Sequence, residues 1–144
     1  MNRRIEPLQP EDADAVFALL TQSRLPVDGL AAHLASTLVA RDGARVVGSA
    51  AIELYPEGAL LRSMAVAQDW QGRHIGRDLA MAVLGLAQDR GATAVYLLTT
   101  TAEQFFRRFG FERIARTEVP ASVQTSVEFQ SACPSNATVM RKRL

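Results

Sequence analysis

The chain has 144 residues, which is enough for one domain with a sizeable buried core. Hydrophobic residues make up 48% and charged residues 22%, a composition that excludes a disordered protein. Sixteen basic and fifteen acidic residues leave a net charge of +1, which excludes an electrostatic field built for nucleic acid or a membrane surface. We expect the short basic run 141–143 to be a solvated tail.

The cysteine content and the hydropathy predict a cytoplasmic protein. A single cysteine, Cys133, cannot form an internal disulfide, so a reducing compartment is expected. The sequence has no apolar run of about 18 residues, and its start lacks the apolar core of a signal peptide. It also has no internal repeat or linker, so we expect one domain over residues 1–144.

The first third of the chain predicts one strand and two helices. Residues 4–8 predict a short edge strand, because a proline within them cannot donate to a central ladder. Residues 10–12 begin a helix, one face of which carries Ala15, Val16, Leu19 and Leu20. Asp28 is expected to cap a second helix, with Leu30 and Leu34 one turn apart.

The middle of the chain predicts a hairpin and a further strand. The dipeptide Asp42-Gly43 separates two apolar runs, 38–41 and 44–54, which is a strong hairpin signal. A second turn at 56–58 leads into a strand at 60–66.

The second half alternates helices and strands. Residues 75–90 predict an amphipathic helix whose apolar face holds Leu79, Val83, Leu86 and Ala87, and Gly91 ends it. Residues 94–98 are a short apolar run, as in a buried strand.

The last part predicts a helix, two strands and a long connection. Thr100 or Thr101 is expected to cap the helix together with Glu103 or Gln104, and its buried face holds Phe105, Phe106 and Phe109. Residues 111–115 and 137–140 predict two strands separated by the segment 119–136. The sum is a mixed sheet with helices packed on it, an α/β (α+β) domain.

Residues 71–76 (QGRHIG) join a strand to a helix in a way that suits an anion. The first N–H groups of a helix have no intrahelical partners, and the helix dipole adds positive charge there. Gly72 and Gly76 permit close approach of a phosphate group, and Arg73 and Arg77 can pair with its oxygens. From local chemistry, a phosphate cradle and a plain strand-to-helix turn both remain open.

The surroundings of this turn resemble a known family. Residues 64–79 (MAVAQDWQGRHIGRDL) resemble the central motif of the GNAT superfamily of N-acetyltransferases, with Gln71 at its first position and Gly76 at its last. Residues 105–111 (FFRRFGF) are similar to the family's later helix that ends in Gly-Phe. The order of elements agrees over essentially the whole chain.

The resemblance implies a fold, a co-substrate and the residues that bind it. The fold is a single GNAT-type domain, with a mixed, mostly antiparallel sheet, a central splayed parallel strand pair and helices on both faces. The co-substrate is acetyl-CoA, with no metal. A bulge at 64–66 would free backbone N–H groups that polarise the thioester carbonyl, which makes Met64 a catalytic position. The implied coenzyme contacts are Met64, Ala65, Val66, Gln71, Gly72, Arg73, His74, Ile75, Gly76, Arg77, Phe105 and Phe106.

Two residues depart from the family pattern. His74 stands where relatives have glycine, and its N–H can still reach a ligand if its backbone stays in the right-handed region; we expect its side chain to be exposed. Phe106 stands four residues before Gly110, where many relatives have a tyrosine that protonates the leaving thiolate. Phenylalanine has no proton to give.

The sequence identifies the acceptor site less specifically than the coenzyme site. Glu53 is the candidate general base, with an exposed strand-end glutamate as the alternative. Arg62 either pairs with Glu53 or receives a substrate carboxylate, since an arginine in an apolar strand needs a partner. The other implied acceptor contacts are Ser63, Thr99, Thr100 and Thr101.

Three sequence segments narrow the resemblance to a subgroup of the family. Residues 60–66 (LLRSMAV), 96–102 (YLLTTTA) and 128–134 (EFQSACP) together look like the small arsenic-resistance N-acetyltransferases, and the second is also similar to the acetyltransferase domain of N-acetylglutamate synthase. Both imply a small-molecule amine acceptor: glutamate, or an analogue such as phosphinothricin or arsinothricin. The segment 119–136 is then either a lid or a homodimer contact, and Cys133 a structural residue. An acceptor at a protein N-terminus and an acetyl-CoA-binding regulatory module without turnover are the alternatives.

Overall fold

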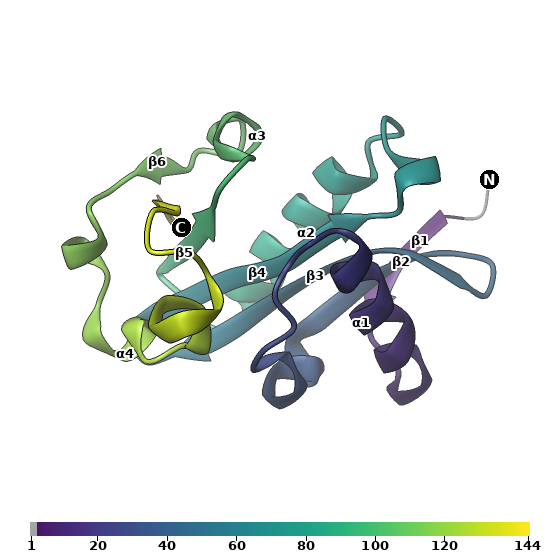
Figure 1. Cartoon of the computed structure of the whole chain (residues 1–144), viewed down its shortest axis with the longest axis horizontal. Coiled ribbons are helices and arrows are strands. Elements are labelled where there is room, and N and C mark those ends of the chain that lie inside the picture. Colours follow the sequence, from purple (N-terminus) through teal and green to yellow (C-terminus); the bar gives the residue numbers. More distant parts are fainter. Residues whose placement is uncertain (1–2) are drawn as a thin grey trace.

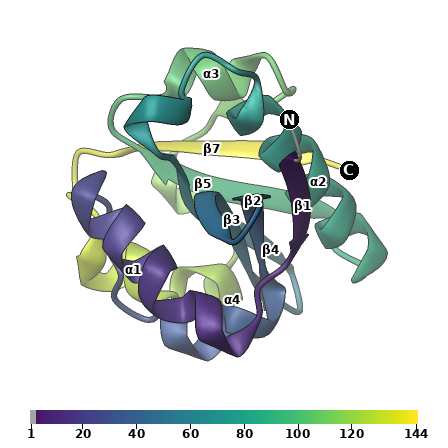
Figure 2. The same cartoon turned by 90° about the vertical axis from the view of Figure 1, so that its right-hand side faces the viewer.

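The computed structural model describes residues 3–144, and within them seven strands form one sheet. The strand order is β1-β2-β3-β4-β5-β7-β6; β4 and β5 are parallel and the other neighbours antiparallel. The helices α1 and α2 pack on β3 and β4 from opposite faces (Figures 1 and 2). The predicted α/β fold with a mixed sheet is therefore confirmed.

The elements follow the predicted order. The strands are β1 (Arg3–Pro7), β2 (Thr37–Asp42), β3 (Arg45–Tyr55), β4 (Gly58–Val66), β5 (Ala94–Thr99), β6 (Glu112–Arg113) and β7 (Thr138–Arg143). The α-helices are α1 (Ala13–Gln22), α2 (Ile75–Asp89), α3 (Glu103–Arg107) and α4 (Ala121–Gln124). Short 3-10 or π turns complete the chain at η1 (Pro10–Asp12), η2 (Leu30–Ser36), η3 (Gln68–Trp70), η4 (Arg116–Glu118) and η5 (Glu128–Ala132). Within the described residues, no helix has the length and apolar character that crossing a membrane requires.

The two long helices bury the faces that their apolar spacing predicts, with one exception. In α2 the side chains of Leu79, Val83 and Ala87 are buried. In α1 Val16, Leu19 and Leu20 are buried, but Ala15 is exposed and Phe17 takes the half-buried position on that face. Gly91 ends α2 with a φ of +86°, a left-handed angle that glycine adopts without steric cost.

Two predicted caps were wrong. The expected second helix is the 3-10 segment η2, which starts after Gly29 at φ +79° without a cap from Asp28 and is interrupted at His33. Helix α3 starts after Ala102, whose N–H donates to the hydroxyl of Thr99, so neither following threonine caps it. The carboxylate of Glu103 pairs instead with two arginines, Arg107 and Arg113.

The C-terminal prediction also needs correction. The basic run 141–143 is part of β7, which pairs with β5 along its length, and is therefore not a solvated tail. The strand predicted at 111–115 is shorter, because β6 pairs with β7 at two positions and the chain then turns into η4. Figure 1 shows the 116–136 segment, green to yellow, at the β5 side of the sheet.

The centre of the sheet is interrupted in two ways. The strands β4 and β5 pair at Ala59↔Val95 and at Leu60↔Tyr96, and then diverge. On its other side, β4 places Ser63 and Met64 together opposite Ala50, because Arg62 pairs with Ala51 and Ala65 pairs with Ser49. This is a β-bulge at Ser63 and Met64, one residue earlier than the position 64–66 that the family resemblance implied.

A charged network fastens the N-terminal edge. The guanidinium of Arg41 on β2 donates to both oxygens of Asp12, at 2.9 and 2.7 Å, and to Glu6 at 2.7 Å. The hydrogen bond from Arg41, opposed by burial and aided by the N–H of Gln9, holds the pKa of Asp12 below its usual value. The network therefore ties β1 and the start of α1 to the sheet.

We predict that Asp12→Asn lowers the free energy of unfolding at pH 7 by about 2 kcal/mol, since charge-assisted hydrogen bonds contribute about 1.5–3 kcal/mol. Because the folded pKa of Asp12 is lowered, its contribution is present above its ordinary pKa and is lost as pH falls through the folded value. Urea unfolding at pH 7 and pH 3 should show the gap between wild type and variant shrinking in acid. Asp14→Asn, an exposed change on the same helix, is the control. Equal stabilities of wild type and Asp12→Asn at pH 7 would contradict this account.

Candidate active site

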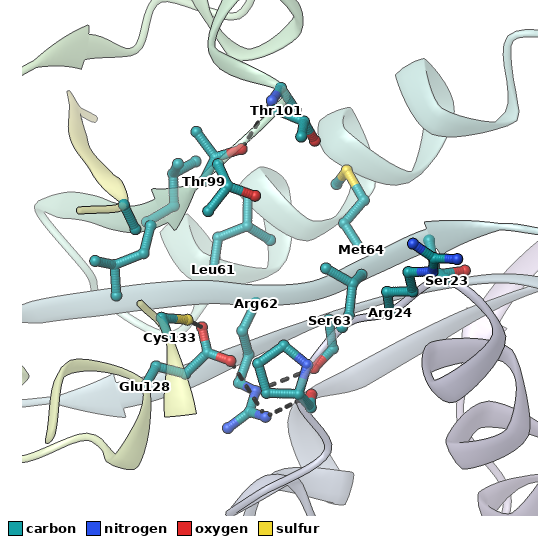
Figure 3. A pocket seen from close by; sticks show the side chains of 18 of the residues that line it. Ser23, Arg24, Leu61, Arg62, Ser63, Met64, Thr99, Thr101, Glu128 and Cys133 are labelled. Atoms are coloured by element: carbon teal, nitrogen blue, oxygen red, sulfur yellow. Dashed lines mark hydrogen bonds and ion pairs between the residues drawn. The ribbon is translucent and has the colours of Figure 1, made fainter. Parts of the chain in front are cut away.

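A cleft of about 930 Å³ lies where β4 and β5 diverge. Its lining comes from four segments: the loop after α1 (Ser23, Arg24, Leu25, Pro26, Asp28), residues 61–66 of β4, residues 97–102 at the end of β5, and the C-terminal segment (Glu128, Cys133, Pro134, Ala137), with Gln71, Gly76, Phe105 and Phe106. Figure 3 shows Arg62 and Glu128 on one side of β4, and Met64 and Thr99 on the other. The cleft therefore passes between the two strands and is lined on both faces of the sheet.

The bulge in β4 shapes the middle of this cleft. Ser63 has a φ of +59°, a left-handed backbone that a serine adopts only at a cost of about 1–2 kcal/mol. The hydroxyl of Ser49 holds it by donating to the carbonyl oxygen of Ser63 at 2.8 Å. Beyond Leu60, β4 no longer pairs with β5. The backbone groups on that edge of β4 therefore face the cleft. Such preorganised N–H groups can polarise a carbonyl bound there.

The turn at 71–76 has the backbone of an anion cradle, although not in the way predicted for His74. Gly72 has a φ of +82° and His74 a φ of +63°, so the histidine is in the left-handed region and not in the right-handed one that we expected. Its side chain is exposed, as predicted. The amide of Gln71 ties the turn to the end of β4 by donating to the carbonyl oxygen of Val66 at 3.2 Å.

A second hollow lies at the start of α2. The first helical hydrogen bond runs from the N–H of Asp78 to the carbonyl of His74, so the N–H groups of Ile75, Gly76 and Arg77 precede it. A Cβ at Gly72 would meet nothing within 4 Å, which leaves the turn open to a ligand. The hollow measures about 710 Å³ and is lined by Val66, Trp70, Gln71, Gly72, His74, Ile75, Gly76, Arg77, Met81, Phe105, Arg108 and Phe109. These dipoles and the nearby cations fit a pyrophosphate group.

The two arginines of the turn differ in position. Arg77 lines the hollow and has an exposed ion pair with Asp78 at 3.3 Å. The guanidinium of Arg73 stacks on the ring of Trp70, 4.6 Å from its centroid, and is absent from the lining of either the cleft or the hollow. Arg77 is therefore the better placed of the two for a bound phosphate.

Arg62 is the centre of a buried charge cluster beneath the cleft (Figure 3). Its side chain is 0% exposed and donates to Glu53 at 2.8 Å, to the hydroxyl of Ser63 at 3.0 Å and to the carbonyl of Pro26 at 3.3 Å. Its remaining ion pair is with Glu128 at 3.4 Å. Of the two predicted alternatives, the pairing of Arg62 with Glu53 is confirmed.

Glu53 differs from the exposed strand-end residue of our alternative, because it is 1% exposed. It is also absent from the residues that line the cleft. The hydroxyl of Tyr55 donates to its second oxygen at 2.5 Å. Burial alone would raise the pKa of Glu53, but hydrogen bonds from Ser126, Tyr55 and Arg62 together hold it below its usual value. Glu53 is thus a carboxylate held in its charged form.

Glu128 and Cys133 form the outer part of the same cluster and line the cleft. The thiol of Cys133 donates to Glu128 at 3.4 Å, and burial next to this carboxylate raises the pKa of the thiol to about 12. Burial also raises the pKa of Glu128. The thiol therefore stays protonated at neutral pH, which agrees with the structural role predicted for Cys133.

The structure brings most of the predicted acceptor residues to the cleft. Arg62, Ser63, Thr99, Thr100 and Thr101 all line it, whereas Glu53 lies behind Arg62. Sequence reasoning missed three charged lining residues, Arg24, Asp28 and Glu128. They lie in loops or a π turn and follow no periodic pattern, so the sequence analysis considered Asp28 only as a helix cap and Glu128 only as part of the segment 128–134. Among the described residues, no cluster of three or more His, Cys, Asp or Glu is arranged to hold a metal ion.

We predict that Gly76→Asp weakens acetyl-CoA binding at least tenfold, since it places a negative charge among the N–H groups expected to hold the pyrophosphate. Gly76→Ala is the matched control: a Cβ there would meet Phe105 at an ordinary 3.6 Å, so affinity should change by less than about threefold. Calorimetric titration of both variants measures the difference. Unchanged affinity in Gly76→Asp would place the coenzyme elsewhere.

Comparison with known proteins agrees with this geometry. The profile of the acetyltransferase (GNAT) domain matches residues 33–113, more than half of the chain. An uncharacterized N-acetyltransferase of Chlorobaculum tepidum is 28% identical over 117 residues, covering 78% of this chain and 75% of the relative. An amino-acid acetyltransferase of Vibrio atlanticus is 29% identical over 96 residues, covering 65% of this chain and 21% of the relative.

Solved structures share the fold. N-acetylglutamate synthase from Neisseria gonorrhoeae, complexed with coenzyme A and N-acetyl-glutamate, superposes with a TM-score of 0.85 at 18% identity; the match covers 100% of this chain and 35% of that one. Rv2747 from Mycobacterium tuberculosis, in complex with CoA, gives 0.84 at 22% identity over 98% of this chain and 99% of that one. This chain thus spans about a third of the synthase but nearly all of Rv2747. The matched domain, the curated relatives and the cleft between β4 and β5 together show that the chain belongs to the GNAT family as an acetyl-CoA-dependent N-acetyltransferase.

Proposed function

We propose that the enzyme transfers the acetyl group of acetyl-CoA to the amino group of a small amino-acid-like acceptor, directly within a ternary complex. Glutamate and its analogues phosphinothricin and arsinothricin are the acceptors we put first. The names of the Vibrio and Neisseria relatives, an amino-acid acetyltransferase and N-acetylglutamate synthase, support this class of acceptor. The residues quoted above for the arsenic-resistance group support the analogues.

The observation that carries the proposal is the lining of the cleft on the Arg62 side. The loop after α1 and the segment that holds Glu128, Cys133 and Pro134 both contribute to it. A small molecule could contact both of these walls at once, so we favour a small acceptor over a protein N-terminus. The segment 119–136 therefore acts as a wall of the site, and its pairing with a second subunit remains a prediction.

The coenzyme contacts follow from the geometry of the cleft. We place the pyrophosphate at the start of α2, the pantetheine arm along residues 64–66 of β4, and the thioester carbonyl at the bulge next to Met64. Phe105 and Phe106 would pack against the arm on the α3 side. Because Phe106 has no proton to give, the leaving thiolate takes its proton from the reacting amine.

Recognition of an acceptor carboxylate falls to Arg24 in this proposal. Arg62 already has Glu53, Glu128, Ser63 and a backbone carbonyl as partners. Arg24 is exposed, lines the cleft, and makes no ion pair within residues 3–144. An unpaired guanidinium is well suited to a carboxylate, which it binds in a bidentate manner. The exposed Thr100 and Thr101 remain predicted hydrogen-bond partners of the acceptor.

The first test is an acceptor screen. The purified protein is incubated with acetyl-CoA and a panel of amino acids that includes glutamate and phosphinothricin, while free thiol is followed. We expect thiol release stimulated by at least one amino acid above the rate with acetyl-CoA alone. If acetyl-CoA binds and no acceptor on a broad panel stimulates release, the regulatory-module alternative replaces this proposal.

The second test concerns Arg24. We predict that Arg24→Gln raises the KM of the amino-acid acceptor about tenfold or more, with the KM of acetyl-CoA changed less than twofold, since a charge-assisted pair contributes about 1.5–3 kcal/mol. Arg90→Gln, an exposed arginine outside the cleft, is the matched control. An unchanged acceptor KM in Arg24→Gln would assign the carboxylate to another group.

A further inference from the structure

Glu128 is the carboxylate of the buried cluster that borders the cleft. It is 4% exposed, yet it is part of the cleft lining, whereas Glu53 is not. One of its oxygens accepts from the thiol of Cys133 at 3.4 Å, and the other lies 3.4 Å from the guanidinium of Arg62. An acceptor bound on the Arg62 side of β4 therefore meets Glu128 as a wall of its site.

The charges of the cluster make Glu128 the residue that can exchange a proton. Arg62 carries one positive charge, and Glu53 at 2.8 Å already neutralises it. A second carboxylate in contact with the same guanidinium is then a surplus buried negative charge, which is costly in a low-dielectric interior. Taking up a proton removes that charge and leaves the Arg62–Glu53 pair unchanged.

The other carboxylates near the acceptor are less suited to this role. Both oxygens of Glu53 are occupied by donors from Tyr55 and Arg62, and these donors favour its charged form. Asp28 lines the cleft but is exposed, so water solvates its charge. A general base works best when its pKa is raised toward the operating pH; burial raises the pKa of Glu128, whereas the donors around Glu53 hold its pKa below the usual value.

On the basis of the proposed function, we infer that Glu128 is the general base of the reaction and accepts a proton from the acceptor's ammonium group. The N–H bond of the ammonium breaks, and its proton forms an O–H bond with the carboxylate of Glu128. The neutral amine then attacks the thioester carbonyl, and the C–S bond breaks. The second proton lost by the nitrogen passes to the coenzyme A thiolate, and Glu128 returns its own proton to water.

The surroundings of Glu128 determine the direction of the pH dependence. Burial raises its pKa, the carboxylates of Glu53 and Asp28 act in the same direction, and Arg62 and the thiol of Cys133 oppose them. Because a base acts in its deprotonated form, kcat should fall about tenfold per pH unit below the pKa of Glu128. This fall of kcat at low pH is the acid limb of the pH profile. Removing the thiol of Cys133 should move the acid limb to higher pH, and removing the charge of Asp28 should move it to lower pH.

The experiment measures kcat and KM from pH 5 to pH 10, with acetyl-CoA and the best acceptor from the screen. For Glu128→Gln, which keeps the shape of the side chain, we expect kcat at pH 7 to fall about 100-fold or more, with the KM of acetyl-CoA nearly unchanged. Its activity should rise with pH as the free amine becomes abundant. Glu112→Gln, an exposed change on β6, is the matched control and should keep the wild-type profile.

Two further variants test the inference even if Glu128→Gln fails to fold. Cys133→Ala should shift the acid limb of kcat upward, and Asp28→Asn should shift it downward. Opposite shifts support Glu128; a limb that stays in place in both variants overturns it, as does a wild-type kcat and pH profile in a folded Glu128→Gln. Absence of turnover in the wild type would instead overturn the proposed function, and the inference with it.

Discussion

The divergence of β4 and β5 is the constraint on which the rest of the structure depends. Two parallel strands that pair at Ala59↔Val95 and Leu60↔Tyr96 and then diverge leave backbone groups without ladder partners in the middle of a sheet. Such groups need a partner. In this protein they face a cleft. A bulge at Ser63, on the edge of β4 that pairs with β3, changes the direction of the strand beside this cleft. In the proposed function, the break in the sheet binds a ligand that can supply the missing hydrogen bonds.

The same break explains why charge is buried next to it. Arg62 lies two residues beyond Leu60, the last β4 residue that pairs with β5. Its side chain is buried below the cleft, where its charge must be neutralised. Glu53 on β3 neutralises it, and Glu128, from a segment far along the chain, adds a second carboxylate. The first pair stabilises the floor of the site. In our inference, the surplus carboxylate is the group of that floor whose charge changes during the reaction.

Local patterns in the sequence predicted much of the fold, and all the coenzyme residues that the resemblance implied, except Arg73, line the cleft or the hollow. Helix α2 with its stop at Gly91 and the hairpin at Gly43 follow from spacing and turn chemistry, whereas the bulge in β4 was implied only by the family resemblance. The start of α3 did not follow from these patterns, because the helix begins after Ala102 without a side-chain cap, and the threonine hydroxyl that accepts from the N–H of Ala102 is that of Thr99. Arg24 and Glu128 could not be found either. Their role depends on two loops meeting across the cleft, which no short-range pattern encodes.

The account is tested most directly by amide hydrogen exchange with and without acetyl-CoA. Residues 64–66 of β4 line the cleft, and Gly72 and residues 74–77 at the start of α2 line the hollow, so a bound coenzyme would give their amides acceptors. We predict slower exchange in these two segments when acetyl-CoA binds, and unchanged exchange in β1 and β2 at the far edge of the sheet. Binding of acetyl-CoA without protection at either segment would contradict the claim that the divergence of β4 and β5 holds the coenzyme.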